Sequence, residues 1–158
     1  MDYYQQLLNL ATELWNKPSP NQADLRRAVS TAYYALFHLL ISEAVANWRF
    51  EDSRNGLSRM FEHHVMAKAS NQLRDTKRFP FVGEDPKVVE KLRLVATRFS
   101  QLQEQRHLAD YDNSITWTQT DVGQEIFRTS RAIDAWKYIK HEKIAQNYLV
   151  SLMIKPRN

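Results

Sequence analysis

The segment Ala32-Tyr-Tyr-Ala-Leu-Phe-His-Leu-Leu-Ile41 is apolar on nearly every side when it is drawn as a helix. It lies in the middle of residues 22–48, which include no glycine and no proline. A helix of this kind is covered by neighbouring helices all round, because it has no polar face to turn towards solvent. The sequence therefore predicts one long central helix, from about Gln22 to Trp48, in an all-α protein.

The residues on both sides of this segment show the three- and four-residue spacing of further helices. Proline, glycine and capping residues mark where these helices begin and end. We expect helices from Asp2 to about Trp15, from Leu57 to about Asp75 after a turn at Asn55-Gly56, from Pro86 with Asp85 as its cap, and after a cap at Thr120-Asp121.

The helix that begins at Pro86 has the most regular apolar spacing in the chain. Its apolar residues alternate steps of four and three, which is the spacing of a helix-bundle seam. They are Val88, Leu92, Val95, Phe99 and Leu102. The last apolar patch, Tyr148 to Ile154, is compatible with a helix or a strand, and we expect a helix because an isolated strand would have no partner. The prediction is an up-and-down bundle of five to six helices, in a single domain of residues 1–158.

The composition indicates a cytoplasmic protein. The chain is 43% hydrophobic, which is enough for one core. It contains no cysteine, which excludes disulfides, thiolate zinc sites and cysteine nucleophiles and fits a reducing compartment. The N-terminus lacks the pattern of a signal peptide, and we find no apolar stretch long enough to span a bilayer. We expect the protein to be neither secreted nor embedded in a membrane.

The net charge of +4 permits an anionic partner, although no block of consecutive basic residues marks a docking segment. With only three glycines, the chain cannot form a glycine-rich phosphate loop or a dinucleotide fingerprint, and we expect no cofactor. A di-metal helical bundle requires two Glu-x-x-His pairs. Only Glu104 with His107 fits, so we expect no metal site.

The stretch Arg106-His-Leu-Ala-Asp-Tyr-Asp112 is the most unusual in the chain. Arg106 continues the apolar seam that ends at Leu102, where packing alone would favour an apolar side chain. An ion pair with Asp110, one turn later, is the structural explanation. The functional explanation is that Arg106 offers its planar guanidinium to a phosphate in a cleft between subunits.

Two segments resemble motifs of the HEPN superfamily of helical-bundle domains. They are Arg106-x-x-Ala-Asp-Tyr-Asp112 and Ser30-x-Ala-Tyr-Tyr-Ala-Leu-Phe-His38, each at the place in the chain where that family has its motif. The resemblance implies an up-and-down bundle, a homodimer and a groove at the dimer interface. Alanines of the central helix, Ala28, Ala32 and Ala35, would also permit a close approach of two helices.

Many HEPN proteins are metal-independent ribonucleases, often toxins of toxin–antitoxin or defence systems that are encoded beside a nucleotidyltransferase. Their motif has a histidine four to six residues after the arginine, and this chain has Tyr111, Asp112 and Asn113 there. A tyrosine with a pKa of about 10 or an aspartate of about 4 is poorly suited to proton transfer at neutral pH. The chain therefore resembles the branch with the Ala-Asp-Tyr form of the motif.

Two functions remain open at this point. One is a ribonuclease toxin in which Arg106 holds the scissile phosphate and Asp110, Tyr111 or His107 assists, although His107 lies about 100° around the helix from Arg106. The other is a non-catalytic HEPN module that binds RNA, a nucleotide or a partner protein. We favour action on RNA without asserting cleavage. A neighbouring nucleotidyltransferase gene would favour a toxin with its antitoxin.

Overall fold

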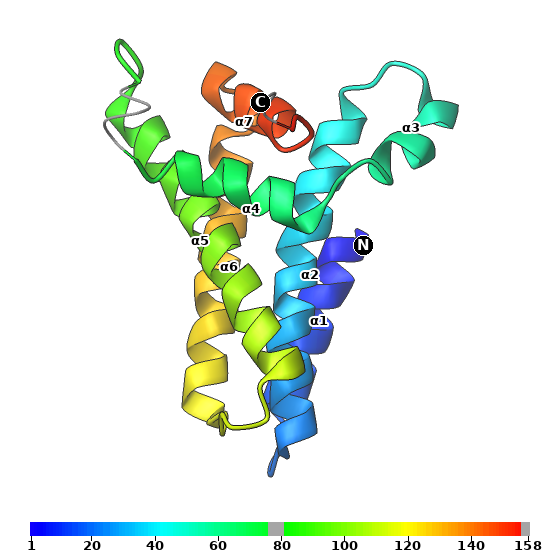
Figure 1. Cartoon of the computed structure of the whole chain (residues 1–158), viewed down its shortest axis with the longest axis vertical. Coiled ribbons are helices and arrows are strands. Elements are labelled where there is room, and N and C mark those ends of the chain that lie inside the picture. Colours follow the sequence, from blue (N-terminus) through cyan, green and yellow to red (C-terminus); the bar gives the residue numbers. More distant parts are fainter. Residues whose placement is uncertain (76–80, 156–158) are drawn as a thin grey trace.

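The computed structural model describes residues 1–75 and 81–155 (Figure 1). These residues form seven helices and no strand, which confirms the all-α prediction with one helix more than the five to six expected. The helices are α1 (Tyr3–Trp15), α2 (Gln22–Ala46), α3 (Glu51–Ser58), α4 (His63–Gln72), α5 (Pro86–Tyr111), α6 (Gln119–Ile139) and α7 (Lys143–Ser151).

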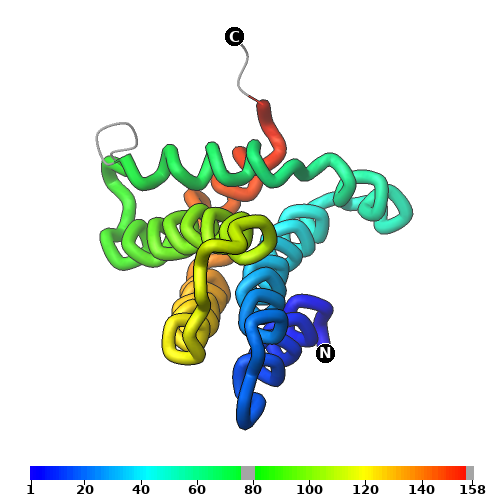
Figure 2. Tube along the Cα trace, turned by 60° about the horizontal axis from the view of Figure 1, so that its bottom comes forward, coloured from blue at the N-terminus to red at the C-terminus, as the bar shows by residue number. Residues whose placement is uncertain are grey.

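The central helix is α2, as its composition predicts. It packs against α1, α5, α6, α3 and α7, and every residue from Val29 to Ile41 except Tyr34 and His38 is buried. In Figure 1 α1 lies beside α2, α5 slants across α6, and α4 crosses near their upper end, and Figure 2 shows α5 lying across α2 and α6. The core therefore surrounds α2. Tyr34 and His38, the two half-buried residues of this segment, lie at the edge of the core.

By length and composition alone, α2 is apolar enough to cross a bilayer. The expectation that no segment reaches that length is therefore wrong. Most of the apolar window is buried against other helices, and the core helices of soluble proteins meet the same criterion. Packing within the chain thus accounts for its apolar surface.

Helices α5 and α6 follow the predicted spacing closely. The five seam residues of α5 are all buried, and so are the residues of α6 at the same helical spacing, Val122, Ile126, Thr129, Ile133 and Trp136. Asp85 caps α5 by accepting a hydrogen bond of 2.9 Å from the amide of Lys87. The cap of α6 is Thr118, two residues before the predicted Thr120, because the Thr118 hydroxyl accepts from the amide of Asp121 at 3.1 Å.

The predicted single helix from Leu57 to Asp75 is wrong. Residues 51–58 form α3, residues 59–62 form a bend, and α4 begins at His63. No residue of α3 is buried, whereas α4 buries Val65, Met66 and Ser70 against its neighbours. Packing across α5 thus sets the direction of α4 and breaks a helix that local spacing would have continued.

The predicted turn at Asn55-Gly56 lies inside α3. Arg54 of α3 donates hydrogen bonds to the backbone oxygens of Ala46 (3.1 Å) and Trp48 (2.9 Å) at the end of α2. Helix α2 therefore ends at Ala46 rather than at Trp48, and a side chain of α3 satisfies the last carbonyl of α2 and that of Trp48 just beyond it. Glu51 and Asp52 in the first turn of α3 favour the helix further.

The C-terminal apolar patch is helical, as expected. It belongs to α7, which begins at Lys143 and ends at Ser151, so Ile154 lies beyond it. The buried hydroxyl of Tyr148 forms a hydrogen bond of 2.7 Å with Ser70, which ties α7 to α4. This bond satisfies two polar groups that would otherwise be buried without a partner.

Candidate functional site

Arg106 lies on α5 where that helix faces α2, and its side chain is 14% exposed. The guanidinium carbon lies 5.1 Å from the ring centre of Tyr33 and 5.9 Å from that of Tyr34. One guanidinium nitrogen, Nη1, lies 3.6 Å from a carboxylate oxygen of Asp110. The Nε atom is buried and has no hydrogen-bond partner among the described residues. The positive charge is thus held by two aromatic faces and only one, rather distant, carboxylate.

The ends of α2 and α5 are fastened together beside this arginine. Arg26 of α2 donates hydrogen bonds to the backbone oxygens of Ala109, Asp112 and Ile115, at 3.0, 2.9 and 2.7 Å. These oxygens lie at and just beyond the end of α5, where a helix has carbonyls without internal partners. Arg26 is therefore structural, and it keeps the last turn of α5 close to α2.

Asp110 is shared between two helices. Besides the contact with Arg106, its Oδ2 atom accepts a long hydrogen bond of 3.5 Å from the hydroxyl of Ser30 on α2. The predicted intrahelical pair of Arg106 and Asp110 is therefore present, at a distance that leaves room for a second acceptor at the guanidinium. Ser30 is the first residue of the motif Ser30–His38, and Asp110 belongs to the motif Arg106–Asp112. The two segments that resemble HEPN motifs therefore meet in space.

A histidine from a third helix completes the cluster. The hydroxyl of Tyr33 lies 2.7 Å from Nδ1 of His63, the first residue of α4, and the His63 ring stacks on Phe37 at a centroid distance of 4.3 Å. We call Ser30, Tyr33, His63, Arg106 and Asp110 the Arg106 cluster. It combines residues of α2, α4 and α5, which no local sequence pattern brings together.

Burial and charge decide the protonation of the cluster. Burial raises the pKa of Tyr33, so its hydroxyl keeps its hydrogen at neutral pH. Burial, together with the positive charge of Arg106, lowers the pKa of His63, so its ring is neutral. Tyr33 is fully buried with His63 as its only hydrogen-bond partner among the described residues, and it therefore donates to Nδ1. The ring hydrogen of His63 then lies on Nε2.

The other two predicted site residues lie apart from the cluster. His107 and Tyr111 are exposed on α5, with ring centres 5.1 Å from each other, and Tyr111 is 69% exposed. They are one turn apart on a helix face about 100° to 140° away from Arg106. The structure therefore brings Arg106 and Asp110 together and leaves His107 and Tyr111 as a separate surface pair.

A rim of half-exposed rings borders the cluster. Tyr34 and His38 lie one turn apart on α2, and Tyr3 of α1 contacts His38 edge to face at 4.8 Å. Burial lowers the pKa of His38, so this ring is also neutral near pH 7. Exposed aromatic faces beside a guanidinium are a surface on which bases of a nucleic acid can stack.

The cluster can supply hydrogen-bond donors to an anion. The guanidinium of Arg106 is 14% exposed and has no carboxylate closer than 3.6 Å, and His63 has an Nε2–H that no described acceptor uses. A phosphate oxygen suits both kinds of donor. Among the residues that the structure describes, no three histidine, aspartate or glutamate side chains lie close enough together to hold a metal ion.

Sequence reasoning did not find His63 as a member of the site. Its neighbour His64 is exposed, and two adjacent histidines on a helix point about 100° apart, so they do not indicate a shared site. Nothing in the spacing of residues 33, 63 and 106 indicates that they meet. The one available signal was that Tyr33 is a tyrosine inside a fully apolar segment, since a buried hydroxyl needs a partner.

One of the two arguments for a homodimer, the alanines of the central helix, is wrong. Ala28, Ala32 and Ala35 are fully buried within the chain, so they form no surface for a second copy. Their small side chains permit the close packing of α2 against helices of the same chain instead. The dimer itself stays a prediction that depends on the resemblance.

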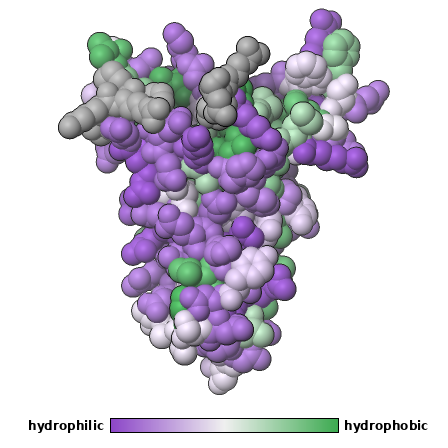
Figure 3. Space-filling view, viewed as in Figure 1, coloured by the Kyte–Doolittle hydropathy of each residue, from purple (hydrophilic) through white to green (hydrophobic). Residues whose placement is uncertain are grey.

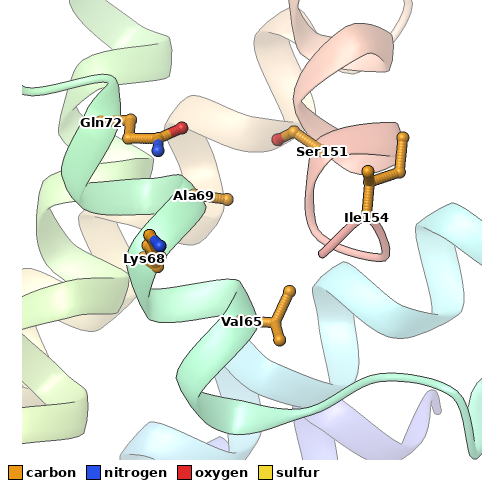
Figure 4. A pocket seen from close by; sticks show the side chains of 6 residues that line it. All are labelled: Val65, Lys68, Ala69, Gln72, Ser151 and Ile154. Atoms are coloured by element: carbon orange, nitrogen blue, oxygen red, sulfur yellow. The ribbon is translucent and has the colours of Figure 1, made fainter. Parts of the chain in front are cut away.

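A pocket between α4 and α7 lies away from the Arg106 cluster. It has a volume of about 220 Å³ and is lined by Val65, Lys68, Ala69, Gln72, Ser151 and Ile154 (Figure 4). Its walls are mostly apolar, and Lys68 is its one charged side chain. None of the residues predicted to act on RNA lines it, so it does not extend the Arg106 cluster.

Three kinds of comparison with known proteins give no match for this chain. No protein-family model matches it, and neither a curated protein nor a solved structure is significantly similar.

Proposed function

We propose that this protein is a HEPN-like helical-bundle domain that binds RNA as a homodimer, with the Arg106 cluster as its phosphate contact. The observation that carries the proposal is a guanidinium that is 14% exposed, lies against the rings of Tyr33 and Tyr34, and has a carboxylate no closer than 3.6 Å. A buried charge is costly unless it is fully paired. A bound phosphate would supply the missing acceptors.

The geometry favours binding over cleavage. Cleavage through the 2′-hydroxyl requires a base that takes up a proton. In His63, Nδ1 is occupied by the Tyr33 hydroxyl and Nε2 carries the hydrogen, so the ring has no free basic nitrogen. His107 lies on a different face of α5. The cluster thus resembles an anion-binding site more than an acid–base pair.

A ribonuclease toxin is the second candidate, and one observation favours it. His63 is neutral at pH 7 because burial and the charge of Arg106 lower its pKa. If its hydrogen moved to Nδ1 when RNA binds, Nε2 would become a base next to Arg106. In that case His63→Gln would abolish cleavage and growth inhibition while RNA binding persisted.

The test is RNA binding by folded variants. Fluorescence anisotropy with a labelled single-stranded RNA of about 12 nucleotides is suitable, since sites of this type cover roughly 4 to 16 nucleotides. We expect Arg106→Ala to weaken binding about tenfold or more, which corresponds to about 1.4 kcal/mol. Arg106→Lys is expected to weaken it too, because an ammonium cannot provide two parallel donors. The matched control is Arg59→Ala, at an exposed arginine outside the cluster.

Unchanged RNA affinity in a folded Arg106→Ala protein would contradict the proposal. The same samples are analysed for RNA fragments, and cleavage that depends on His63 would favour the ribonuclease instead. Light scattering gives the oligomeric state, for which we expect twice the 18.7 kDa of one chain.

A further inference from the structure

A groove between α5 and α6 gathers basic side chains on a surface that the Arg106 cluster does not use. Two pockets, of about 640 and about 240 Å³, form it. Both are lined by Leu94, Thr97 and Arg131, so they are parts of one continuous depression. Hydrophilic side chains dominate the left flank of the space-filling view in Figure 3, where Figure 1 shows α5 and α6.

The charge of the groove is strongly one-sided. Six basic residues and one acidic residue, Glu90, line it among the described residues. Glu125 lies behind the lining and pairs with Arg98 and Arg128. Even when Glu125 is counted, six basic against two acidic residues leave an excess of four positive charges.

Three basic side chains of the groove have no carboxylate partner among the described residues. Lys87, Lys91 and Arg131 have no ion pair with another described residue, whereas Arg98 is buried and paired. Lys87 and Arg131 are exposed, and Lys91 is half-buried. Such side chains are free to contact an anion, and their mutual repulsion falls when one binds.

Two exposed aromatic rings accompany these charges. Tyr138 is 70% exposed and its ring centre lies 4.8 Å from the ammonium of Lys91, and Phe127 is 62% exposed. Phe127, Arg131 and Tyr138 follow each other at steps of four and seven residues, so they share one face of α6. From Phe127 to Tyr138 this face is about 16 Å long, room for roughly four to five nucleotides.

We propose that this groove binds the sugar-phosphate backbone of single-stranded nucleic acid, whose bases stack on Tyr138 and Phe127. A positively charged groove with aromatic platforms is the arrangement by which proteins bind single strands without reading their sequence. A flat membrane surface does not enter a groove, and an acidic protein has no bases to stack on the rings. The site goes beyond the proposed function, because it lies outside the Arg106 cluster.

The experiment compares a groove variant, Lys91→Gln with Arg131→Gln, and a matched control, Lys68→Gln with Lys143→Gln. Both pairs remove two positive charges, and the control lysines are exposed on α4 and α7. The probes are fluorescent oligouridylate and oligothymidylate of about 12 nucleotides. We expect the groove variant to bind at least about tenfold more weakly, with a slope of log affinity against log salt smaller by about 1.4. The control is expected to bind like the wild type.

A third variant tests the stacking. Tyr138→Leu is expected to weaken binding about fivefold or more without changing the salt slope, because stacking contributes about 1–3 kcal/mol per base. Equal binding of both probes would indicate recognition of the backbone and bases alone. Preference for the uridylate over an oligodeoxyuridylate of the same length would indicate a contact with the 2′-hydroxyl, because these two differ in that group alone. Both results support the groove as the site.

Three results would overturn the proposal. They are wild-type affinity in the groove variant, an equal loss in the control, and competition by polyglutamate as effective as that by the oligonucleotides. The Arg106→Ala variant separates this site from the cluster. Loss in Arg106→Ala but not in the groove variant would leave the proposed function standing and reject the groove, and the reverse result would do the opposite.

Discussion

Arg98 and Arg106 lie two turns apart on α5, and they differ in their exposure and in the groups that surround their positive charge. Arg98 pairs with Glu125 of α6 and donates a hydrogen bond of 3.2 Å to Gln101, with its side chain 4% exposed. Arg106 has aromatic faces and the more distant Asp110. Burial lowers the pKa of Arg98 to about 10, so it remains charged at neutral pH. Arg98 has a close carboxylate and is part of the core. Arg106 has no close carboxylate, so it is available to a ligand.

The largest expected effect is at Arg98. Arg98→Ala leaves the Glu125 carboxylate, which is 12% exposed, without its main partner. We expect the free energy of unfolding to fall by about 3–5 kcal/mol in urea denaturation, as when one member of a buried pair is removed. Arg98→Met together with Glu125→Leu removes both charges and is expected to recover most of this loss. Failure of the double variant to recover would indicate that the arginine packs rather than pairs.

Arg106→Ala is expected to cost less, about 1–2 kcal/mol. Its contacts with Tyr33 and Tyr34 make Arg106 part of the packing, so it contributes more to stability than an exposed ion pair with Asp110 alone. Thermal and urea unfolding of the two alanine variants under the same conditions measure the difference. A cost at Arg106 equal to that at Arg98 would remove the distinction between them.

Tyr33→Phe sharpens the description of the Arg106 cluster. Removing the hydroxyl leaves Nδ1 of His63 without its donor and is expected to cost about 1 kcal/mol of stability. Nitrogen NMR of the wild type is expected to show His63 with its hydrogen on Nε2. A hydrogen on Nδ1 at neutral pH would instead leave Nε2 basic and favour the ribonuclease.

The smallest effect is a pH dependence of stability. His38 and His63 have lowered pKa values in the folded state, mainly through burial, so the unfolded chain binds more protons. Stability is therefore complete above the unfolded histidine pKa of about 6.5 and falls as the pH drops below it. Replacing both residues by glutamine is expected to flatten this decline between about pH 7 and pH 5 in urea titrations. An unchanged slope would mean that other groups cause it.

The long helices were predictable because their packing repeats locally. The central segment around Ala32–Ile41 and the seam from Val88 to Leu102 are buried as their spacing predicts. The bend at residues 59–62 was not predictable, because Phe61 continues the helical spacing on both sides of it. The contacts of α4 with α5, α7 and α2, which are distant in sequence, set its direction and separate it from α3.

Part of the candidate site was predictable, because contacts within one helix follow from local spacing. Arg106 and Asp110 are one turn apart on one helix, so their contact follows from helix geometry. Arg98 escaped notice because it lies beside the seam, and its partner Glu125 belongs to another helix. The contact between Tyr33 and His63 joins residues that are 30 positions apart, and it depends on the direction that α4 takes.

The most direct test follows the Nε–H signals of Arg98 and Arg106 by proton–nitrogen NMR during titration with single-stranded RNA. Because the guanidinium of Arg106 is 14% exposed and its carboxylate partner is 3.6 Å away, we expect its Nε–H signal to shift when a phosphate of the RNA contacts the guanidinium. The Arg98 signal is expected to stay in place, because that side chain is 4% exposed and paired with Glu125. Movement of the Arg98 signal with an unchanged Arg106 signal at saturating RNA would contradict the assignment of Arg106 as the phosphate contact.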